Sequence, residues 1–294
     1  MEPPFQRVLV LGTGLLGASA GLALRAAGFP GSIAGWDKDS AQLQTALDRG
    51  ALHTAAADAA EAIQLARAAD LILLCGPVHS ILDWMQTLAP TLQPGQLITD
   101  VGSTKLRITA AAEELFASPD RATFLPGHPM AGRELSGAAF ADPDLFRNAA
   151  WLFTATPALL LAPGAASRAA LWQGWVQRFG ATPIEIDAAE HDQLLAWTSH
   201  LPQLLSTALA AELQSRLGAP DSAHRQIGGR ALRDMTRLGA SPFSMWRDIA
   251  STNSEAIAAA LHALEQRLAH IRENLRTPAL RDEFDQANRF RSGS

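Results

Sequence analysis

The stretch from Gly127 to Gly137 gathers side chains that could do acid–base chemistry. It contains His128 and Glu134, together with an arginine and a serine close by. The whole chain has no tyrosine, so any proton transfer must use side chains of these other kinds. The prolines and glycines of the stretch predict a loop, because they are unfavourable in helices and in central strands. This loop lies between two halves of different character, which is where a substrate could meet a cofactor.

The first half opens with a glycine fingerprint for nucleotide binding. Residues 7–11 are an apolar run that fits a buried strand, and G-x-G-x-x-G follows at once, before a helical pattern. Gly12 would allow the tight turn, Gly14 would let the backbone approach a pyrophosphate, and Gly17 would let helix and strand pack closely. Leu15 and Leu16 belong to the same expected cofactor-binding segment.

Asp37 favours NAD as the cofactor. It ends a second strand, residues 32–37, about 20 residues after Gly17, which is the spacing of a carboxylate that binds ribose hydroxyls. A carboxylate there repels the 2′-phosphate of NADP, so NAD is expected. The alternative is a glycine-rich turn followed by an acid through chance.

Strands and helices continue to alternate, which predicts an α/β Rossmann domain with a doubly wound, mainly parallel sheet. The expected helices cover residues 41–49, 61–69, 80–88 and 104–116, and the expected strands cover 70–75 and 96–101. Two late strands, 151–154 and 182–186, are expected to close this sheet around a helix over 165–179.

Ligands of such sheets bind at the carboxyl ends of the strands. Gly76-Pro77 and Ser103 are predicted there, beside the glycine fingerprint and the His128 loop, so we expect one shared site. Ser103 could equally cap the helix that begins at Thr104, and both roles are compatible. Lys105 is expected in the solvated first turn of that helix, or as a charge near a phosphate.

From residue 188 the pattern is helical only. This divides the chain into an NAD-binding domain, residues 1–187, and an all-helical substrate and dimerisation domain, residues 188–294. A long helix over 190–217 should kink at Pro202, with His200 beside the kink, either facing a cavity or serving the structure. A helix over 221–237 and a short helix capped by Ser241 before Pro242 follow.

The last long helix, residues 254–276, carries apolar residues at alternating spacings of three and four. This seam could pack within one chain, but a homodimer through the C-terminal helices is the sharper prediction. The polar tail from Asp282 to Ser294 is expected to be disordered.

Composition narrows the class of protein. The 294 residues are 48% hydrophobic and 18% charged, with a net charge of −5 that argues against nucleic acid or an anionic membrane as partner. One cysteine, Cys75, permits no internal disulfide and favours a reducing compartment. We expect no signal peptide and no membrane span, and therefore a cytoplasmic protein.

Several motifs together resemble the prephenate/arogenate dehydrogenases of tyrosine biosynthesis, and the resemblance covers nearly the whole chain. The motifs are Gly12 to Gly17, Asp100 to Lys105, Gly127 to Gly132 with Glu134 and Ser136-Gly137, Glu190 to Asp192, Ser199 to Pro202, and Arg233 to Arg237 followed by Met245 to Asp248. The fold of that family, a Rossmann domain followed by a helical dimerisation domain, agrees with the pattern above.

The resemblance implies an NAD-dependent oxidation of the ring alcohol of prephenate or arogenate, with loss of the ring carboxylate as CO2. It implies that His128 is the base that takes the hydroxyl proton. It also implies that Ser103 is the hydrogen-bond partner at that hydroxyl, and that Arg237 grips a substrate carboxylate.

The other residues that the resemblance places on the substrate side have more varied roles. Trp246 would be a pocket wall, Glu134 a gating or polar partner, and Asp192 a residue that reaches across the dimer, while His200, Thr236 and Gln203 would also face the substrate. The chain departs from the family at Gln203, where a second histidine is common. Strict preference for prephenate and inhibition by tyrosine are therefore not implied.

Two other classes of protein share part of this pattern. One is the two-domain NAD dehydrogenases for β-hydroxyacids, which use a lysine of the helical domain, whereas Lys38 and Lys105 both lie in the first half of this chain. The other is a non-catalytic, NAD-binding redox sensor, which would not need the combination of His128, Ser103 and Arg237.

Overall fold

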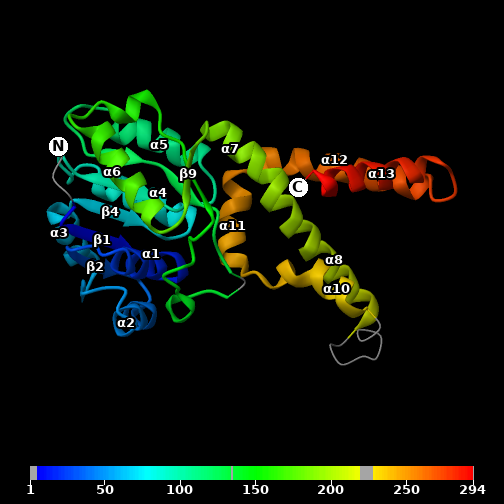
Figure 1. Ribbon diagram of the computed structural model, residues 1–294, viewed down its shortest axis with the longest axis horizontal. Coiled ribbons are helices and arrows are strands. Elements are labelled where there is room, and N and C mark those ends of the chain that lie inside the picture. Colours follow the sequence, from blue (N-terminus) through cyan, green and yellow to red (C-terminus); the bar gives the residue numbers. More distant parts are fainter. Residues whose placement is uncertain (1–4, 134, 219–227, 294) are drawn as a thin grey trace.

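The N-terminal half is built on a parallel sheet of six strands (Figure 1), which confirms the predicted Rossmann fold. The computed structural model describes residues 5–133, 135–218 and 228–293. The strand order is β3-β2-β1-β4-β5-β6, and all neighbouring strands are parallel. The strands are β1 Arg7–Leu11, β2 Ser32–Trp36, β3 Thr54–Ala55, β4 Leu71–Leu74, β5 Leu97–Asp100 and β6 Thr123–Leu125.

Helices cover both faces of this sheet, as its apolar central strands require. One core contains side chains from α1 and α6 and the other contains side chains from α3, α4 and α5. The helices are α1 Leu15–Ala26, α2 Ser40–Asp48, α3 Ala59–Ala68, α4 Val78–Leu88, α5 Leu106–Phe116 and α6 Ala165–Arg178, with short 3-10 turns η1 Ala138–Phe140 and η2 Pro157–Leu160.

A second, three-stranded sheet corrects two expectations. The strands β8 Ala150–Phe153 and β9 Thr182–Glu185 do not close the large sheet but pair with each other in parallel. The third strand, β7 Gly127–Pro129, pairs antiparallel with β8, although its residues were expected in a loop. β7 is an edge strand, so Pro129 can occupy its last position without interrupting a central ladder.

The C-terminal half is helical, as predicted, with different boundaries. Its elements are α7 Ala188–Leu195, the π-helical turn η3 Ala196–His200, α8 Leu201–Leu217, α10 Gly229–Thr236, the 3-10 turn η4 Arg237–Ala240, α11 Phe243–Thr252, α12 Ser254–Glu273 and α13 Ala279–Ser292. The helix expected over 190–217 is present as α7, η3 and α8, and the π-helical turn ends at His200, two residues before Pro202. The predicted helix over 221–237 lies partly outside the described residues.

Two local expectations in this half are wrong. Ser241 does not cap α11; its hydroxyl donates to Gln203 instead, and α11 has no side-chain cap. The tail expected to be disordered forms α13, which turns back from the end of α12 and is joined to it by an ion pair between Arg267 and Glu283.

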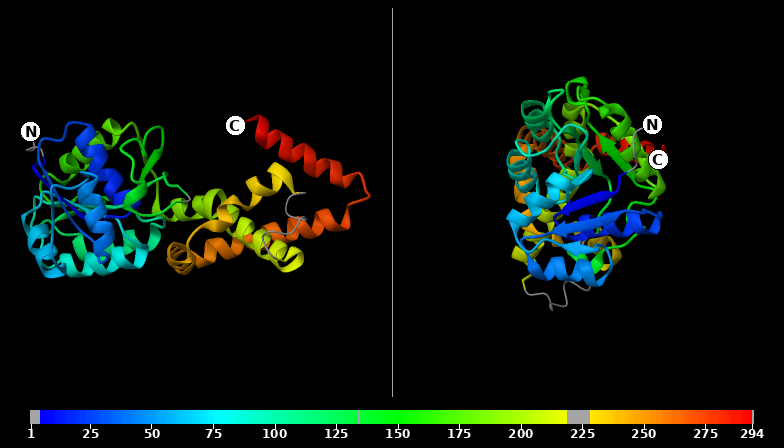
Figure 2. Two further views of the ribbon diagram at one scale, coloured as in Figure 1. Left: turned by 90° about the horizontal axis from the view of Figure 1, so that it is seen from below. Right: turned by 90° about the vertical axis from the view of Figure 1, so that its left-hand side faces the viewer.

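The helical half extends away from the Rossmann domain as two arms, α8 with α10 and α12 with α13 (Figure 2). A small apolar core joins the arms where they leave the N-terminal domain: Ala196, Leu201, Ile249, Ile257 and Ala260. Among the described residues, no helix is both long enough and apolar enough to cross a membrane.

Candidate active site

His128 lies on β7, next to the carboxyl end of the large sheet, and only 8% of its surface is exposed. Its backbone position is fixed by strand pairing, in which His128 of β7 lies opposite Leu152 of β8. Burial lowers the pKa of His128 well below its usual value, and the neighbouring His191, Lys105 and His200 lower it further. The imidazole is therefore neutral near pH 7.

A buried ion pair attaches β7 to the end of β5. Asp100 accepts a hydrogen bond from the backbone N–H of Gly127 at 3.0 Å and from that of Gly102 at 2.7 Å, and its carboxylate pairs with the ammonium group of Lys105. The same ammonium group donates to the carbonyl of Gly127 at 2.7 Å. Lys105 was expected in solvent, but it is fully buried, because α5 begins only at Leu106 and the preceding turn directs the lysine inward.

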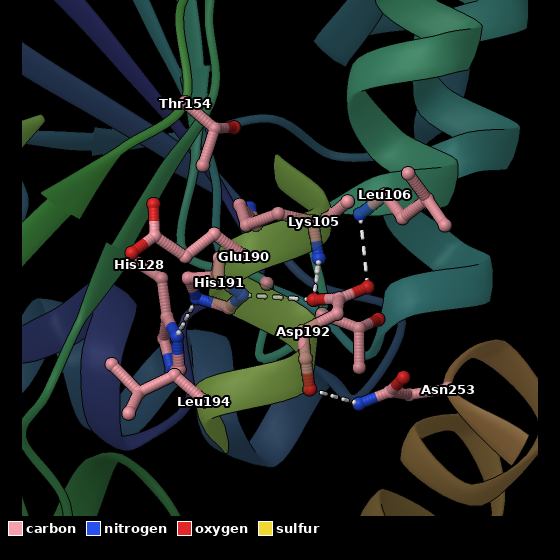
Figure 3. Close-up of polar contacts among 12 residues, drawn as sticks. Lys105, Leu106, His128, Thr154, Glu190, His191, Asp192, Leu194 and Asn253 are labelled. Atoms are coloured by element: carbon pink, nitrogen blue, oxygen red, sulfur yellow. Dashed lines mark hydrogen bonds and ion pairs between the residues drawn. The ribbon is translucent and has the colours of Figure 1, made fainter. Parts of the chain in front are cut away.

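A chain of hydrogen bonds leads from His128 into the helical half (Figure 3). His128 Nδ1 lies 2.9 Å from His191 Nε2, and His191 Nδ1 lies 2.8 Å from Asp192 Oδ1. His191 is completely buried and Asp192 is 3% exposed. Burial also lowers the pKa of His191, although its hydrogen bond to Asp192 opposes that shift.

Asp192 binds the N-terminal domain of its own chain, and the expectation that it reaches across a dimer stays a prediction. Its carboxylate accepts the backbone N–H groups of Lys105 at 2.7 Å and Leu106 at 3.0 Å, where α5 begins. Its carbonyl accepts the side-chain amide of Asn253 at 2.8 Å. One residue therefore connects α7, α5 and the start of α12 (Figure 3).

The buried His200 and the partly buried Trp246 form an aromatic pair behind this series of hydrogen bonds. The two rings meet edge-to-face with centroids 5.8 Å apart, and the His200 ring also lies 3.3 Å from the amide of Asn253. Burial lowers the pKa of His200 to about 4. The indole N–H of Trp246 is buried and has no hydrogen-bond partner within the described part of the chain.

Gln203 fastens the turn that carries Arg237. Its amide nitrogen donates to the carbonyl of Leu238 at 2.6 Å and to the Thr207 hydroxyl at 3.2 Å, while its oxygen accepts the Ser241 hydroxyl at 3.0 Å. The turn η4 is thereby held against α8, with the side chain of Arg237 at the surface.

Two further residues, Thr236 and Glu134, were expected on the substrate side. The Thr236 hydroxyl donates to the carbonyl of Leu232 within α10. Glu134 lies outside the described residues.

The glycine fingerprint has the geometry that a dinucleotide needs. Gly12 has a φ of +95°, and a Cβ at Gly17 would lie 1.9 Å from the carbonyl of Gly12, so neither position admits a side chain. A Cβ at Gly14 would meet nothing within 4 Å, which leaves open space at the N-terminus of α1, and that N-terminus has no side-chain cap. Leu15 and Leu16 form its first turn, where free N–H groups favour a phosphate.

Asp37 lies beside this turn. It accepts the backbone N–H of Thr13 at 2.6 Å and that of Asp39 at 2.9 Å. Gly76 and Pro77 follow β4, the strand adjacent to β1, so they lie at the same edge of the sheet. The fold thus brings the expected cofactor residues together.

Ser103 does not cap α5, contrary to one of its two expected roles, since Lys105 occupies the cap position. Its half-buried side chain makes no hydrogen bond to any residue that the structure describes, so the hydroxyl is available to a ligand.

Comparison with known proteins shows which family the chain belongs to. The family described as "Prephenate dehydrogenase, nucleotide-binding domain" matches residues 20–159, and "Prephenate dehydrogenase, dimerization domain" matches residues 187–288. The chain belongs to the prephenate dehydrogenase family.

Individual members of the prephenate dehydrogenase family are similar to this chain in sequence and in structure. The curated prephenate dehydrogenase of Lactococcus lactis is 32% identical over 85% of this chain, and the chain spans 66% of the length of that relative. Among solved structures, prephenate dehydrogenase from A. aeolicus in complex with hydroxyphenyl propionate and NAD+ has a TM-score of 0.84 at 25% identity, covering 100% of this chain and 97% of its own. Synechocystis arogenate dehydrogenase has a TM-score of 0.75 at 29% identity, covering 98% of this chain and 99% of its own.

In this member of the prephenate dehydrogenase family, three polar residues around His128 were not predicted as parts of the site: Asp100, Lys105 and His191. The sequence carried one usable signal, since His191 stands next to Asp192 at the start of a helix. Nothing in the spacing of Asp100 and Lys105 distinguishes a buried ion pair from a strand end followed by a solvated lysine.

Proposed function

We propose that this protein is an NAD-dependent dehydrogenase that converts prephenate to 4-hydroxyphenylpyruvate, or arogenate to tyrosine, with release of CO2. The observation that carries the proposal is the buried, neutral His128 beside the carboxyl edge of a dinucleotide-binding sheet. Its Nδ1 is occupied by His191, while Nε2 has no hydrogen-bond partner within the described residues.

In this proposal His128 Nε2 accepts the proton of the ring hydroxyl as the hydrogen on the same carbon leaves as hydride. Ser103 binds that hydroxyl and orients it. When the ring carboxylate departs as CO2, its electron pair completes the aromatic ring and reaches the former hydroxyl oxygen, which recovers the proton from His128. The overall change consumes NAD+ and yields CO2 and NADH.

NAD fits the residues at the carboxyl edge of the sheet. The open space at Gly14 and the uncapped N-terminus of α1 would hold the pyrophosphate, with Leu15 and Leu16 in the first helical turn. Asp37 would bind the ribose hydroxyls, while Gly76 and Pro77 would line the neighbouring strand end. When bound, the nicotinamide supplies the hydride acceptor.

For the substrate side, we propose that Arg237 binds a carboxylate and that Trp246 and His200 form the wall against the ring. The buried indole N–H of Trp246 has the hydrogen-bonding capacity for a substrate oxygen. Gln203, Thr236, Glu134 and Asp192 complete the proposed surroundings, with Gln203 acting through the turn that carries Arg237.

We further propose that the domain boundary lies near residue 187 and that the protein is cytoplasmic. We also propose a homodimer formed by the helical arms. The first part of the apolar seam of α12 packs inside the chain, whereas Leu268 is 50% exposed. Leu275, in the turn just after α12, is 61% exposed. Phe284 of α13 is 63% exposed on the same arm. Because these large apolar side chains are exposed on an extended arm, we propose that a second copy of this chain covers them.

NADH formation tests the proposal. Purified protein with NAD+ is given prephenate in one assay and arogenate in a second, and absorbance at the NADH band is followed. Turnover of either substrate supports the dehydrogenase, and the ratio of the two kcat/KM values gives the preferred substrate. NAD+ binding without turnover of either would favour the nucleotide-binding sensor instead.

A further inference from the structure

We propose that His191 and Asp192 are positioning residues that fix the tautomer of His128, so that Nε2 always presents its lone pair to the substrate. We call the buried series His128–His191–Asp192 the histidine relay. This inference rests on the proposed function, but its central claim concerns the position of a proton and can be tested without substrate.

The direction of each hydrogen bond in the histidine relay follows from Asp192. As a carboxylate it can only accept hydrogen bonds, and it already receives two backbone N–H groups at the start of α5. His191 Nδ1, at 2.8 Å, must therefore carry a proton and donate it. A neutral imidazole has one ring proton, so His191 Nε2 is left as an acceptor.

The same logic applies one step further along. His191 Nε2 accepts, so His128 Nδ1, at 2.9 Å, must be the donor. The single proton of a neutral His128 is then on Nδ1, and Nε2 is unprotonated. A base fixed in this state needs no tautomer change before it takes a proton, as with the histidine of a Ser-His-Asp triad.

The surroundings explain why such a device is needed. From the N-terminal domain, the ammonium group of Lys105 faces His128, and from the helical domain, His191 and His200 face it. All of these disfavour a positive charge on the ring, and Asp100 is already paired with Lys105. Asp192, reached through His191, is therefore the carboxylate that supports His128 while it holds the substrate proton.

Because Asp192 also joins the two domains, a purely structural role for this region must be distinguished from the relay. The two roles predict different effects of replacing His191. If His191 only filled space between the domains, its replacement would lower stability without altering the ring protons of His128. The relay instead predicts that replacement changes the tautomer of His128 and lowers kcat, while KM and NAD+ affinity stay the same.

The test uses full-length protein labelled with 15N in histidine. Two-bond 1H–15N correlation spectra report which ring nitrogen carries the proton, with the His128 signals assigned from their absence in His128→Asn. We expect protonated Nδ1 and unprotonated Nε2 at His128 in the unmodified protein. In His191→Phe, which removes the acceptor, we expect a mixture of tautomers. Protonated Nε2 at His128 in the unmodified protein overturns the proposal, whether or not the protein turns over prephenate or arogenate.

Kinetics give the second readout. His191→Phe should lower kcat by ~10- to 100-fold with unchanged KM, which is the scale expected of a residue that orients a reacting group. His191→Gln should restore part of the loss, because its side-chain oxygen can accept from His128, and it also serves if the Phe variant does not fold. His262→Gln, on the exposed face of α12, is the matched control. A kcat for His191→Phe within twofold of the unmodified enzyme overturns the proposal.

Discussion

His128 differs from an ordinary surface histidine in its burial, which keeps the ring neutral, and in its engaged Nδ1. We predict that His128→Asn lowers kcat by ~10²–10⁴-fold, because general base catalysis typically contributes that much. NAD+ affinity, measured by fluorescence titration, should stay unchanged, since the glycine fingerprint is untouched. Turnover at the original rate would remove His128 from the proposed role.

At the same scale, Gln203 shows how a residue near a site can act through another. Because its amide holds the turn η4, Gln203→Ala should raise KM by roughly 3- to 10-fold with little change in kcat, as one buried hydrogen-bonding group is lost. Arg237→Leu, which removes the proposed carboxylate contact, should raise KM by about 10- to 100-fold.

A double-mutant cycle links these two changes. If Gln203 acts through the turn that carries Arg237, the effects of the two substitutions on KM should be less than additive. Independent, additive effects would mean that Gln203 meets the substrate by itself. Gln214→Ala, farther along α8, is the comparison for loss of an amide.

At the scale of elements, the position of β7 depends on Asp100 and Lys105. Lys105→Met should lower the free energy of unfolding by about 3–5 kcal/mol, because it leaves a fully buried carboxylate without its cation. Urea denaturation measures the change. Lys38→Met, at an exposed position, should stay within about 0.5 kcal/mol of the unmodified protein. An equally small effect of Lys105→Met would contradict the assigned ion pair.

The elements also show what a single sequence can and cannot predict. Four strands of the large sheet, β1, β2, β4 and β5, and the helix α12 were predicted because their apolar patterns are strong and local. The short strands β3 and β6 were not predicted. The strand β7 was not, because its three residues acquire strand geometry only by pairing with β8, which is distant in sequence. The helix α13 was not predicted either, because its sequence is mostly polar and none of its residues is buried in the described chain.

The site was predicted only in part, because some of its contacts join segments that are distant in sequence. Residue types at strand ends identified His128, Ser103 and the glycine fingerprint. The burial of Lys105 and the contact from Asp192 to α5 depend on how the two halves dock, and no local pattern contains that information.

At the scale of the whole molecule, the exposed end of the α12 seam predicts a dimer that can be broken. Leu268→Lys together with Leu275→Lys should convert a dimer to a monomer in analytical ultracentrifugation, because two charges would enter an apolar contact. Leu161→Lys, at a similarly exposed position on the N-terminal domain, should leave the mass unchanged. A monomer before any substitution would contradict the proposed assembly.

The buried histidines make the stability of the whole molecule depend on pH. His128, His191 and His200 have lowered pKa values in the folded protein, whereas the unfolded chain has pKa values near 6.5. Below about pH 6.5 the unfolded state therefore binds protons that the folded state does not. The free energy of unfolding should fall as the pH falls, by up to about 1.4 kcal/mol per pH unit for each histidine.

Urea denaturation at pH 7.5, 6.5, 5.5 and 5.0 measures this dependence, and for His200 the window extends down to its pKa of about 4. His200→Asn should reduce the slope below pH 6.5, while His262→Asn should not. A constant free energy of unfolding between pH 7 and 5 would mean that these rings are solvated in the folded protein.

The attachment of Asp192 to the start of α5 has a consequence for recombination between relatives. A chimera that joins the nucleotide-binding half of one parent to the helical half of another inherits the proposed base, His128, from the first parent. It inherits Asp192, the proposed supporting carboxylate, from the second. Such a hybrid could fold, bind NAD+ and dimerise, yet remain a poor catalyst if the junction shifts α7 relative to α5. Functional crossovers should therefore be those in which both parents agree on the residues that meet at this one seam.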